Sequence, residues 1–371
     1  MMIGKRVLKL AGLLGIMIVL YSIFGWMLLF NGIGSESHIR NFYREPENSI
    51  DVAIIGCSEV YSDYSPPLAY GEFGYTSYNL GSSAVPGKFY RSMLCEYLKY
   101  QNPQLVVIEM NGFFYNEEQS AREGPVRQWI DNMPKSYNWV RTITENVARE
   151  DRMDYFFSFS KYHSNWEKYK QQYGRIEDLK RNFVDGVSIM KGFVTITTKN
   201  SEYEKERKEQ NLNDFGREQL EDLLGYCKDC GLKNVLFVRM PHVNQLSEAC
   251  NEELARVISE AGYDFLNCDV LSEDIGLEIY DDYYNAEHLN ASGNEKFTRY
   301  LGEYIVSNYE INQTHSADVD KLWDKCYQYT VQIFDVLKKR TLLNEEIYYY
   351  EFTDFSEEAH QEKLQELRNK K

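Results

Sequence analysis

The sequence has no run or stripe of basic residues. Across 371 residues, 57 acidic side chains stand against 41 basic ones, which gives a formal net charge of −16. A surface that binds nucleic acid needs clustered Lys and Arg side chains to neutralise phosphates. We therefore expect no nucleic acid among the partners of this chain.

Cysteines are also few. Seven is an odd number and does not suggest a disulfide framework in a domain this large. Cys227 and Cys230 form a C-x-x-C, but no second cysteine pair or His-x-x-x-His follows at zinc-ligand spacing. The stretch around them is amphipathic and ends at a glycine, which puts both thiols in the last turn of a helix. Thiols in or near a core are the favoured interpretation, with a redox role or a Cys230–Cys268 bridge as alternatives.

An internal repeat is missing as well. What the chain does contain is 43% hydrophobic and 15% aromatic residues, enough to fill a sizeable core. Its length suits one large domain, or one domain with an extension. Disorder is therefore not expected for most of the chain.

The first thirty residues differ in kind from the rest. Residues 10–30 contain no charged side chain and are about long enough to cross a hydrocarbon core of roughly 30 Å. Lys5, Arg6 and Lys9 precede this run, and the bias of basic residues favours a cytoplasmic N-terminus. A cleaved signal peptide is the alternative, but no Ala-x-Ala-like site follows. The sequence predicts a single-pass anchor over residues 1–35, with the main domain outside the cell.

Behind the anchor, short apolar runs alternate with amphipathic stretches over residues 50–310. This alternation is typical of an α/β fold, in which a parallel sheet is flanked by helices. The run QLVVIEM (104–110) is continuously apolar, as expected for a strand covered on both faces. The other predicted strands are 52–57, 76–81, 234–240 and 263–269, and the predicted helices are 87–101, 214–231, 246–262 and 294–309.

The alternation lapses between residues 111 and 211, where aromatic and charged residues dominate. We interpret 111–211 as an inserted helical and loop region that lies over one end of the sheet. The last part, 311–371, is more charged and forms a C-terminal extension. It is predicted to be helical over 318–338 and 356–370.

Polar residues follow several of the predicted strands. They are Ser58, the turn 79–81, Asn111 and the loop 285–288. In open parallel sheets, ligands bind where the carboxyl ends of the strands meet. A serine on a tight turn there points its hydroxyl at this edge, and a histidine beyond the last strand can reach it as general base. The layout is that of a Ser–His hydrolase.

In these stretches the chain resembles the SGNH, or GDSL-like, hydrolase superfamily. It is most similar to the membrane-anchored branch that works beside membrane-bound O-acyltransferases on bacterial surface polymers. The alginate O-acetylation proteins and the D-alanyl transfer protein of teichoic acid synthesis belong to that branch. The resemblance covers residues 50–310 and implies a three-layer α/β/α fold with no metal and no organic cofactor. It is carried by IIGCSEVYSDYSP, YNLGSSA, VVIEMN and DDYYNAEHLNASG.

The resemblance implies a role for each matched residue. Ser58 would be the nucleophile and His288 the general base. The backbone N–H of Gly81 and the side-chain amide of Asn111 would donate to the oxyanion. Glu109 stands where the family usually has a glycine.

The last block departs from the family's Asp-x-x-His, because Asn285 occupies the place of the aspartate. A carboxylate there holds the imidazole and stabilises its cation, whereas an amide can orient the ring but supplies no charge. His288 therefore keeps Asn285 as its partner or takes another carboxylate, of which Asp281 and Asp282 are the nearest in sequence. Some members of the superfamily work as Ser–His dyads.

The expected function is that of a membrane-tethered, extracytoplasmic serine acyltransferase or esterase. Its substrate would be the O-acyl groups of a cell-surface polysaccharide or teichoic-type polymer. The expected partners are this polymer, an acyl donor and a membrane-bound O-acyltransferase. The alternative is a non-catalytic accessory or polymer-binding protein with a degenerate SGNH site.

Overall fold

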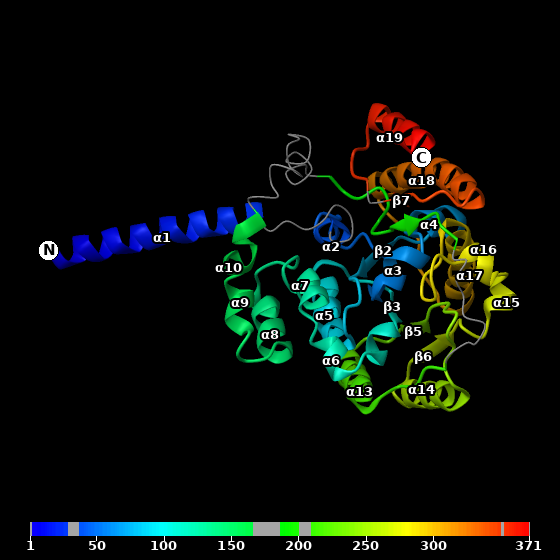
Figure 1. Cartoon of the computed structure of the whole chain (residues 1–371), viewed down its shortest axis with the longest axis horizontal. Coiled ribbons are helices and arrows are strands. Elements are labelled where there is room, and N and C mark those ends of the chain that lie inside the picture. The colour runs from blue at the N-terminus through cyan, green and yellow to red at the C-terminus, as the bar shows by residue number, and fades with distance from the viewer. Residues whose placement is uncertain (1, 29–36, 166–185, 200–208, 350–351, 371) are drawn as a thin grey trace. The chain divides into compact units, whose positions relative to one another are not determined.

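The computed structural model of the chain describes residues 2–28, 37–165, 186–199, 209–349 and 352–370. The chain divides into two compact units, and each is described by itself. One unit comprises residues 1–32 and 140–185, and the other comprises residues 33–139 and 186–371. Figure 1 shows the apolar helix α1 in the first unit and the central sheet in the second.

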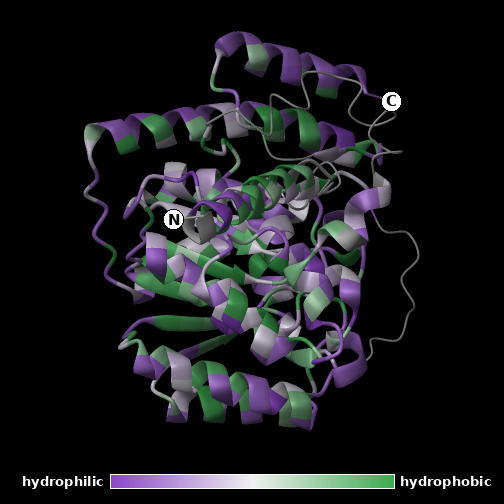
Figure 2. Ribbon diagram, turned by 90° about the vertical axis from the view of Figure 1, so that its left-hand side faces the viewer, coloured by the Kyte–Doolittle hydropathy of each residue, from purple (hydrophilic) through white to green (hydrophobic). Residues whose placement is uncertain are grey.

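A five-stranded parallel sheet forms the centre of the second unit. Its strand order is β2-β1-β3-β5-β6, and every neighbouring pair is parallel. The predicted strands are confirmed, and four of the five are buried along their whole length because both faces of the sheet are covered. Figure 2 shows these strands as predominantly hydrophobic ribbon. The strands are β1 Val52–Gly56, β2 Ser77–Gly81, β3 Leu105–Glu109, β5 Val235–Arg239 and β6 Asp264–Asn267.

Helices pack on both sides of the sheet. Alternate strand residues point to opposite faces, and Val52 and Ile54 of β1 share a core cluster with Phe297 and Leu301 of α17. Helix α5 also packs on β1, and Figure 1 shows it on the side opposite α17. The helices of this layer structure are α3 Ser58–Asp63, α4 Pro66–Phe73, α5 Tyr90–Tyr100, α13 Asp214–Asp229, α14 Glu248–Glu260 and α17 Ala291–Asn308. Shorter helices are α2 Ser37–Phe42, η1 Gly87–Phe89, α15 Ser272–Ile275 and α16 Ile279–Asp282.

The order of the strands indicates the edge of the sheet at which a ligand site is expected. The chain leaves β1 for β2 on one side and returns to β3 on the other, so the connections after β1 and β3 run in opposite directions. Ligand sites of open α/β sheets form at such a reversal, outside the carboxyl ends of the strands. Ser58 follows β1 and Asn111 follows β3 at this point.

The predicted insert belongs to two units rather than one. Its first part, 111–139, stays in the unit of the sheet, where Trp129 Nε1 donates to Ser92 Oγ of α5 at 3.0 Å. Residues 140–165 instead group with α1. Residues 166–185 and 200–208 of the insert lie outside the described residues. The described elements are η2 Asn111–Phe114, α6 Glu117–Ser120, α7 Glu123–Ile130, α8 Tyr137–Asn146, α9 Arg152–Phe156, α10 Phe159–Tyr162, η3 His163–Asn165 and β4 Thr195–Ile196.

The C-terminal extension is helical, as predicted, and is integrated with the sheet unit. Helix α18 (Ala317–Leu342) packs on α4, and α19 (Glu357–Asn369) packs on α18. Strand β7 (Tyr348–Tyr349) pairs antiparallel with β4. Residues near the end of the insert, including Ile189 and Phe193, join the core cluster of α18.

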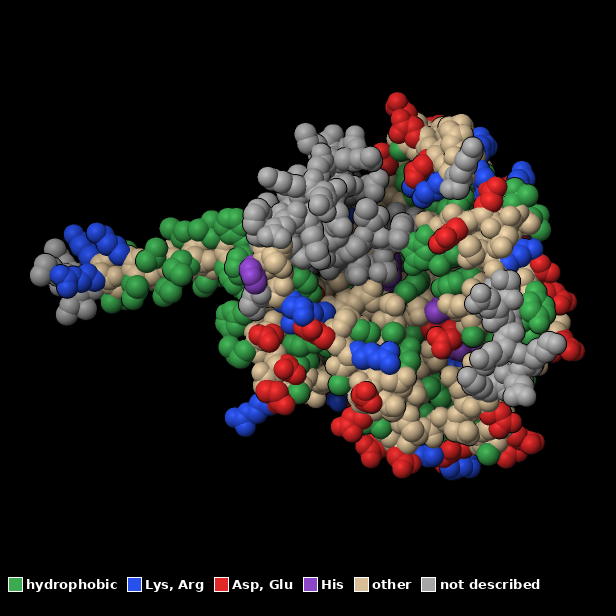
Figure 3. Space-filling model, viewed as in Figure 1, with side chains coloured by type: hydrophobic (Ala, Val, Ile, Leu, Met, Phe, Trp, Pro, Cys, Tyr) green, Lys and Arg blue, Asp and Glu red, His purple; other side chains and the backbone are tan. Residues whose placement is uncertain are grey.

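Helix α1 (Met2–Leu28) contains a stretch, Lys5–Gly25, that is long and apolar enough to cross a membrane. Its described apolar side chains are mostly exposed, and Figure 3 shows basic side chains at its free end and hydrophobic ones along its length. The helix agrees with the predicted anchor. The orientation of the chain across a membrane stays a prediction.

The seven cysteines are all free. Cys227 is buried in the last turn of α13, and Cys230 caps that helix. The suggested Cys230–Cys268 bridge is absent, since Cys230 is exposed and Cys268 is buried.

Candidate active site

Two glycines shape the turn that presents Ser58. β1 ends at Gly56, whose φ of +155° is rarely adopted by residues with a side chain, and Ser58 begins α3 two residues later. A Cβ on Gly56 would lie 2.5 Å from Cβ of Glu109, and a Cβ on Gly81 would lie 2.6 Å from the Cys57 carbonyl oxygen. Both glycines are therefore needed for the close approach of β2 and β3 to the serine turn.

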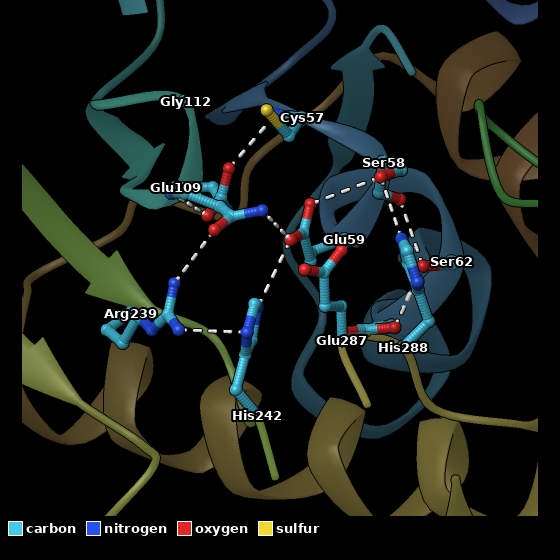
Figure 4. Close-up of polar contacts among 12 residues, drawn as sticks. Cys57, Ser58, Glu59, Ser62, Glu109, Gly112, Arg239, His242, Glu287 and His288 are labelled. Carbon is cyan, nitrogen blue, oxygen red and sulfur yellow. Dashed lines mark hydrogen bonds and ion pairs between the residues drawn. The ribbon is translucent and has the colours of Figure 1, made fainter. Parts of the chain in front are cut away.

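Ser58, His288 and Asn285 are connected by two hydrogen bonds in series, and Figure 4 shows the one between Ser58 and His288. Ser58 Oγ lies 2.7 Å from His288 Nε2, and His288 Nδ1 lies 2.9 Å from Asn285 Oδ1. His288 comes from the loop between α16 and α17, which the Leu289 N–H fixes to α3 by donating to Asp63 Oδ1 at 2.9 Å. The structure thus brings together the three residues that the sequence predicts as nucleophile, base and orienting partner.

The contacts of Asn285 determine which nitrogen of His288 carries the proton. Its Oδ1 also accepts the backbone N–H of Glu287 at 2.8 Å, which identifies this atom as the oxygen of the amide. His288 Nδ1 must then carry the proton that it shares with Asn285. The lone pair of Nε2 therefore faces Ser58, which is the tautomer that a general base needs.

His288 is a neutral but weak base. Burial, with His242 nearby, lowers the pKa of His288 to about 3. The ring also stacks on Tyr284, with centroids 5.2 Å apart and planes inclined by 12°. No charge comes from Asn285 to stabilise an imidazolium, so the imidazole is neutral at pH 7 and gains little from taking a proton.

Asp281 and Asp282 do not serve His288. The Asp281 side chain is 64% exposed and pairs with Lys199 at 2.6 Å. Asp282 is buried, but its carboxylate pairs with Lys296 at 2.7 Å. The alternative acids suggested by sequence proximity are therefore directed away from the imidazole, and Asn285 is its partner.

Glu59 adds a second side chain beside the serine. It is fully buried, and its Oε2 lies 3.3 Å from Ser58 Oγ. Its other oxygen, Oε1, accepts from Asn111 Nδ2 at 2.5 Å and lies 3.1 Å from His242 Nε2. Ser58 is thus flanked by His288 on one side and by a carboxyl group on the other.

Arg239, at the end of β5, donates hydrogen bonds to both residues that contact Glu59 Oε1. Its Nη1 donates to Asn111 Oδ1 at 3.0 Å, its Nη2 donates to His242 Nδ1 at 2.8 Å, and its Nε donates to Asp269 Oδ2 at 3.0 Å. A guanidinium is always a donor, so His242 Nδ1 carries no proton and Nε2–H donates to Glu59. Burial and the Arg239 charge lower the pKa of His242 well below its ordinary value.

Gly81 and Asn111 lie at the ends of β2 and β3, on either side of β1. The Asn111 amide orientation is fixed, because its oxygen accepts from Arg239 and its nitrogen donates to Glu59. Its described contact is therefore with a protein carboxyl group. The oxyanion roles of Gly81 and Asn111 stay predictions.

Glu109 ties β3 to the serine turn. Its Oε2 accepts from the Cys57 N–H and from Tyr90 Oη, each at 3.0 Å, and its Oε1 accepts from the Asn111 N–H. Burial, with Glu59 nearby, raises the pKa of Glu109 to about 8. Glu109 thus braces the turn that carries Ser58.

The thiol of Cys57 and the carboxyl groups of Glu59 and Glu109 lie close enough together to share a metal ion, if distance alone is considered. The ligand atoms of Cys57, Glu59 and Glu109 all lie within 4.8 Å of one another. Protein groups already occupy them: Cys57 Sγ donates to the Val85 carbonyl at 3.0 Å, and both carboxyl groups accept protein hydrogen bonds. Burial also raises the pKa of the thiol and of both acids, and a protonated thiol or carboxyl group binds metals poorly. We assign no metal to this cluster.

Sequence reasoning missed Glu59, Arg239, His242 and Asp269. The available signal was position: Glu59 follows the serine, and Arg239 and His242 flank the Pro241 that ends the β5 stretch. The rule that predicted Ser58 and Asn111, which collects residues after parallel strands at one edge, applies to β5 equally.

The site as a whole joins a buried serine, a correctly oriented imidazole and a carboxyl group. Such a set can form and break an acyl-serine bond. In comparisons with models of known protein families and with curated proteins, the chain matches no family model and no curated protein.

Proposed function

We propose that this chain is a membrane-anchored serine acyltransferase or esterase of SGNH type. The observation that carries the proposal is the 2.7 Å contact of Ser58 Oγ with a His288 Nε2 whose lone pair faces it. A hydroxyl that donates to an imidazole lone pair is the resting arrangement of a serine nucleophile.

The reaction proceeds in two half-reactions. Ser58 Oγ bonds to the acyl carbonyl carbon, its proton passes to His288 Nε2, and the carbonyl electron pair moves to oxygen. Collapse of this oxyanion breaks the bond to the first alcohol, which leaves with the proton from His288. Water or a second alcohol then attacks the acyl-serine by the same steps, and Ser58 is regenerated.

The SGNH assignment rests on several features together. The strand order β2-β1-β3-β5-β6 brings the matched residues Ser58, Gly81 and Asn111 to one edge of the sheet, and His288 reaches the same edge. These residues are the ones through which the sequence resembles the superfamily. An O-acyl group on a surface polysaccharide or teichoic-type polymer is the proposed substrate, because the resemblance is to the anchored branch that acts on such polymers.

Anchoring and partners belong to the same proposal. The Lys5–Gly25 span would hold the catalytic unit at the outer face of the cell membrane, with the N-terminus in the cytoplasm. An acyl donor, the polymer and a membrane-bound O-acyltransferase would be its partners.

One observation favours the competing function of a non-catalytic accessory or polymer-binding protein. Asn285 supplies no charge to His288, and burial lowers the pKa of His288 to about 3. A site that has lost its acid could keep its geometry and lose its turnover.

The two functions differ in acyl release. The detergent-solubilised full chain is mixed with a model acetyl ester, and acyl release is compared for the parent, Ser58→Ala and the control Ser62→Ala. Ser62 is a buried serine on the same helix, so its loss tests general damage to α3. Release that depends on Ser58 and not on Ser62 supports the enzyme, and parent release equal to that of Ser58→Ala supports the accessory protein.

A further inference from the structure

Ser58 has one hydroxyl proton but two close neighbours. His288 Nε2 is a lone-pair acceptor at 2.7 Å, so the Ser58 proton lies on that contact. Glu59 Oε2 lies 3.3 Å from the same Oγ. The second contact is a hydrogen bond only if Glu59 supplies the hydrogen.

The surroundings of Glu59 decide where its proton would lie. Oε1 already accepts from the Asn111 amide and from the Nε2–H of His242. Oε2 has Ser58 as its described partner. A neutral Glu59 therefore carries its hydrogen on Oε2, directed at the serine oxygen.

Glu59, rather than Glu109, is the better holder of a proton in this buried pair. Glu109 accepts three hydrogen bonds, from Cys57, Asn111 and Tyr90, and such donors stabilise an ionised carboxylate. Glu59 accepts two side-chain hydrogen bonds on Oε1 and has its own backbone N–H as a further donor, but its Oε2 faces the oxygen of a serine whose proton lies on His288. Two buried carboxyl groups this close do not both ionise readily, and we place the proton on Glu59 because its Oε2 has an acceptor in front of it.

The charges that face Glu59 favour the same state. Burial, with Glu287 nearby, raises the pKa of Glu59 to about 8, although the hydrogen bond from its own backbone N–H and the Arg239 charge oppose this rise. Arg239 is itself paired with the buried Asp269. The charged groups around Glu59 include Asp63 on α3, Glu109 on β3, Arg239 and His242 from β5 and the loop after it, and Glu287 and His288 from the loop before α17. The other titratable groups that interact with it are the thiol of Cys57 and the hydroxyls of Tyr61, Tyr90, Tyr115 and Tyr284.

We infer that neutral Glu59 is a catalytic hydrogen-bond donor, which supports the developing oxyanion at Ser58 from the side opposite His288. This inference rests on the proposed function. As Oγ bonds to the acyl carbon and passes its proton to His288, the negative charge develops on the acyl carbonyl oxygen beside Oγ. Glu59 Oε2–H then donates to that carbonyl oxygen instead of to Oγ and keeps its own proton. The negative charge of the tetrahedral intermediate thus lies beside a neutral hydrogen-bond donor rather than beside a carboxylate. This donor compensates in part for the stabilisation that an aspartate in place of Asn285 would provide.

The donor state is tested by infrared spectroscopy of the full chain in detergent at pH 6.5. We expect the C=O stretching band of a protonated carboxyl group, lost in Glu59→Gln and shifted to higher frequency in Ser58→Ala, where the acid loses its acceptor. Glu109→Gln is the matched control, because it removes the other buried acid of the pair. A parent spectrum identical to that of Glu59→Gln, or a band that Ser58→Ala leaves in place, would overturn the inference.

Kinetics test the catalytic part. Glutamine can accept at Oε1 and donate from Nε2, so Glu59→Gln should keep acyl release within about tenfold, whereas Glu59→Ala should lose about 10²–10³-fold, the cost typical of one oxyanion donor. We expect the rate of the parent to decline as Glu59 ionises near pH 8, and Glu59→Gln should lack this decline. An equal loss of acyl release in Glu59→Gln and Glu59→Ala would contradict the donor role. The same alkaline decline in rate in Glu59→Gln as in the parent would also contradict it. A parent rate equal to that of Ser58→Ala would end the proposed function, while the infrared result would still decide the state of Glu59.

A separate observation concerns the unit that contains α1. Tyr21, within the Lys5–Gly25 span, packs against Phe157 and Phe159, with ring centroids 6.1 Å and 5.7 Å apart. The Phe159 N–H donates to Tyr21 Oη at 3.3 Å. Tyr21 lies about 6 Å before the end of the span at Gly25, at 1.5 Å per residue. The segment 157–159 therefore lies beside the last turns of the span.

Two apolar side chains of this segment face outward. Met153 is 59% exposed and Phe157 is 52% exposed, next to a helix whose own apolar side chains are exposed. Tyr and Trp side chains concentrate at the boundary between headgroups and acyl chains, and Tyr21, near the end of the span, is such a residue. Continuity with the helix that we propose to span the membrane makes lipid the expected occupant of this surface.

We propose that α9 and α10 form a collar around the end of the spanning helix. The collar lies in the membrane–water interface at the outer face of the cell membrane, with Met153 and Phe157 against lipid. The test uses Met153→Trp in the full chain, reconstituted in vesicles of phosphatidylcholine and phosphatidylglycerol with bromine near the headgroup end of the acyl chains. The added tryptophan emission should be lost to bromine quenching. Leu342→Trp is the control, since Leu342 is 71% exposed on α18 in the other unit, and its emission should be unaffected.

Two results would overturn the collar. Unquenched and water-exposed emission at residue 153 would place the segment in solvent. Emission that is shielded from water yet unquenched by bromine would show that protein, either a second copy or another subunit, covers this surface instead of lipid.

Discussion

Ser58 Oγ lies 2.7 Å from His288 Nε2, although the two residues are 230 positions apart in the chain. This contact depends on the parallel sheet, which delivers the end of β1 and the loop before α17 to one edge. The imidazole is oriented by Asn285, and Asn285 is oriented in turn by the Glu287 N–H. The Asn285 amide therefore orients the imidazole as an aspartate would, but it does not supply the negative charge of an aspartate.

Asn285→Asp should restore that charge. An aspartate in the same place accepts from Glu287 and His288 and stabilises the imidazolium, so the pKa of His288 and the rate of acyl release should both rise. The reverse change in a serine protease costs about 10⁴-fold in kcat, which sets the upper limit for the gain. Steady-state release from a model ester measures it. Asp281→Asn is the control and should leave the rate unchanged, because Asp281 pairs with Lys199; a gain in neither rate nor pKa from Asn285→Asp would contradict a working base.

Gly81→Ala should disturb the serine turn. Its new Cβ would lie 2.6 Å from the Cys57 carbonyl oxygen, so the residues before Ser58 must move. Misplacement of a reacting group by about 1 Å can cost about 10²-fold in rate. Gly225→Ala is the matched control, because it lies within α13 with nothing within 4 Å of its Cβ. Equal acyl release from the two variants would show that the Gly81 contact is unimportant.

Arg239→Met should destabilise the fold. It leaves Asp269 buried without its ion-pair partner, and the loss of one member of a buried pair costs about 3–5 kcal/mol. The exposed pair Arg256–Glu260 provides the control, where Arg256→Met should cost about 1 kcal/mol or less. Denaturant unfolding of the full chain in detergent compares the two. Similar costs for both substitutions would be inconsistent with the buried network.

Stability should also depend on pH through Glu59. Its pKa is raised from 4.5 in the unfolded chain to about 8 in the folded chain, so the folded state binds more protons between these values. The free energy of unfolding must then fall as pH rises from about 5 to about 8, roughly by a few kcal/mol. Glu59→Gln should flatten this slope and be more stable than the parent at pH 8.5. An unchanged slope in that variant would show that Glu59 ionises freely in the folded chain.

Sequence patterns predicted the strands and the contact of Ser58 with His288 for physical reasons. Buried parallel strands are short continuous apolar runs, and each run in this chain ends at a glycine, a proline or a polar residue. The strand ends share one edge, so Ser58 and His288 could be paired before any coordinates were known. The resemblance to the SGNH superfamily used the same positions.

Other parts of the site could not be read from the sequence. The orientation of Asn285 depends on a backbone N–H of Glu287, and this contact has no residue signature. Arg239 and His242 are signalled in the sequence only by their position at the end of β5, and their hydrogen bonds form only where β5 meets β3 in the folded chain. Proximity in sequence suggested Asp281 and Asp282 as acids, but short helical and turn geometry directs both to lysines. The division of the insert likewise follows tertiary packing against α1 rather than local periodicity.

Labelling with a fluorophosphonate tests the central claim most directly, because the probe reacts only with a serine that a neighbouring base activates. We expect intact-mass analysis of the full chain to show one phosphonyl group, located on Ser58 by peptide mapping. His288→Ala should prevent the labelling, and Ser62→Ala should retain it. A parent chain that stays unlabelled, or a label that persists without His288, would contradict a serine nucleophile activated by this histidine.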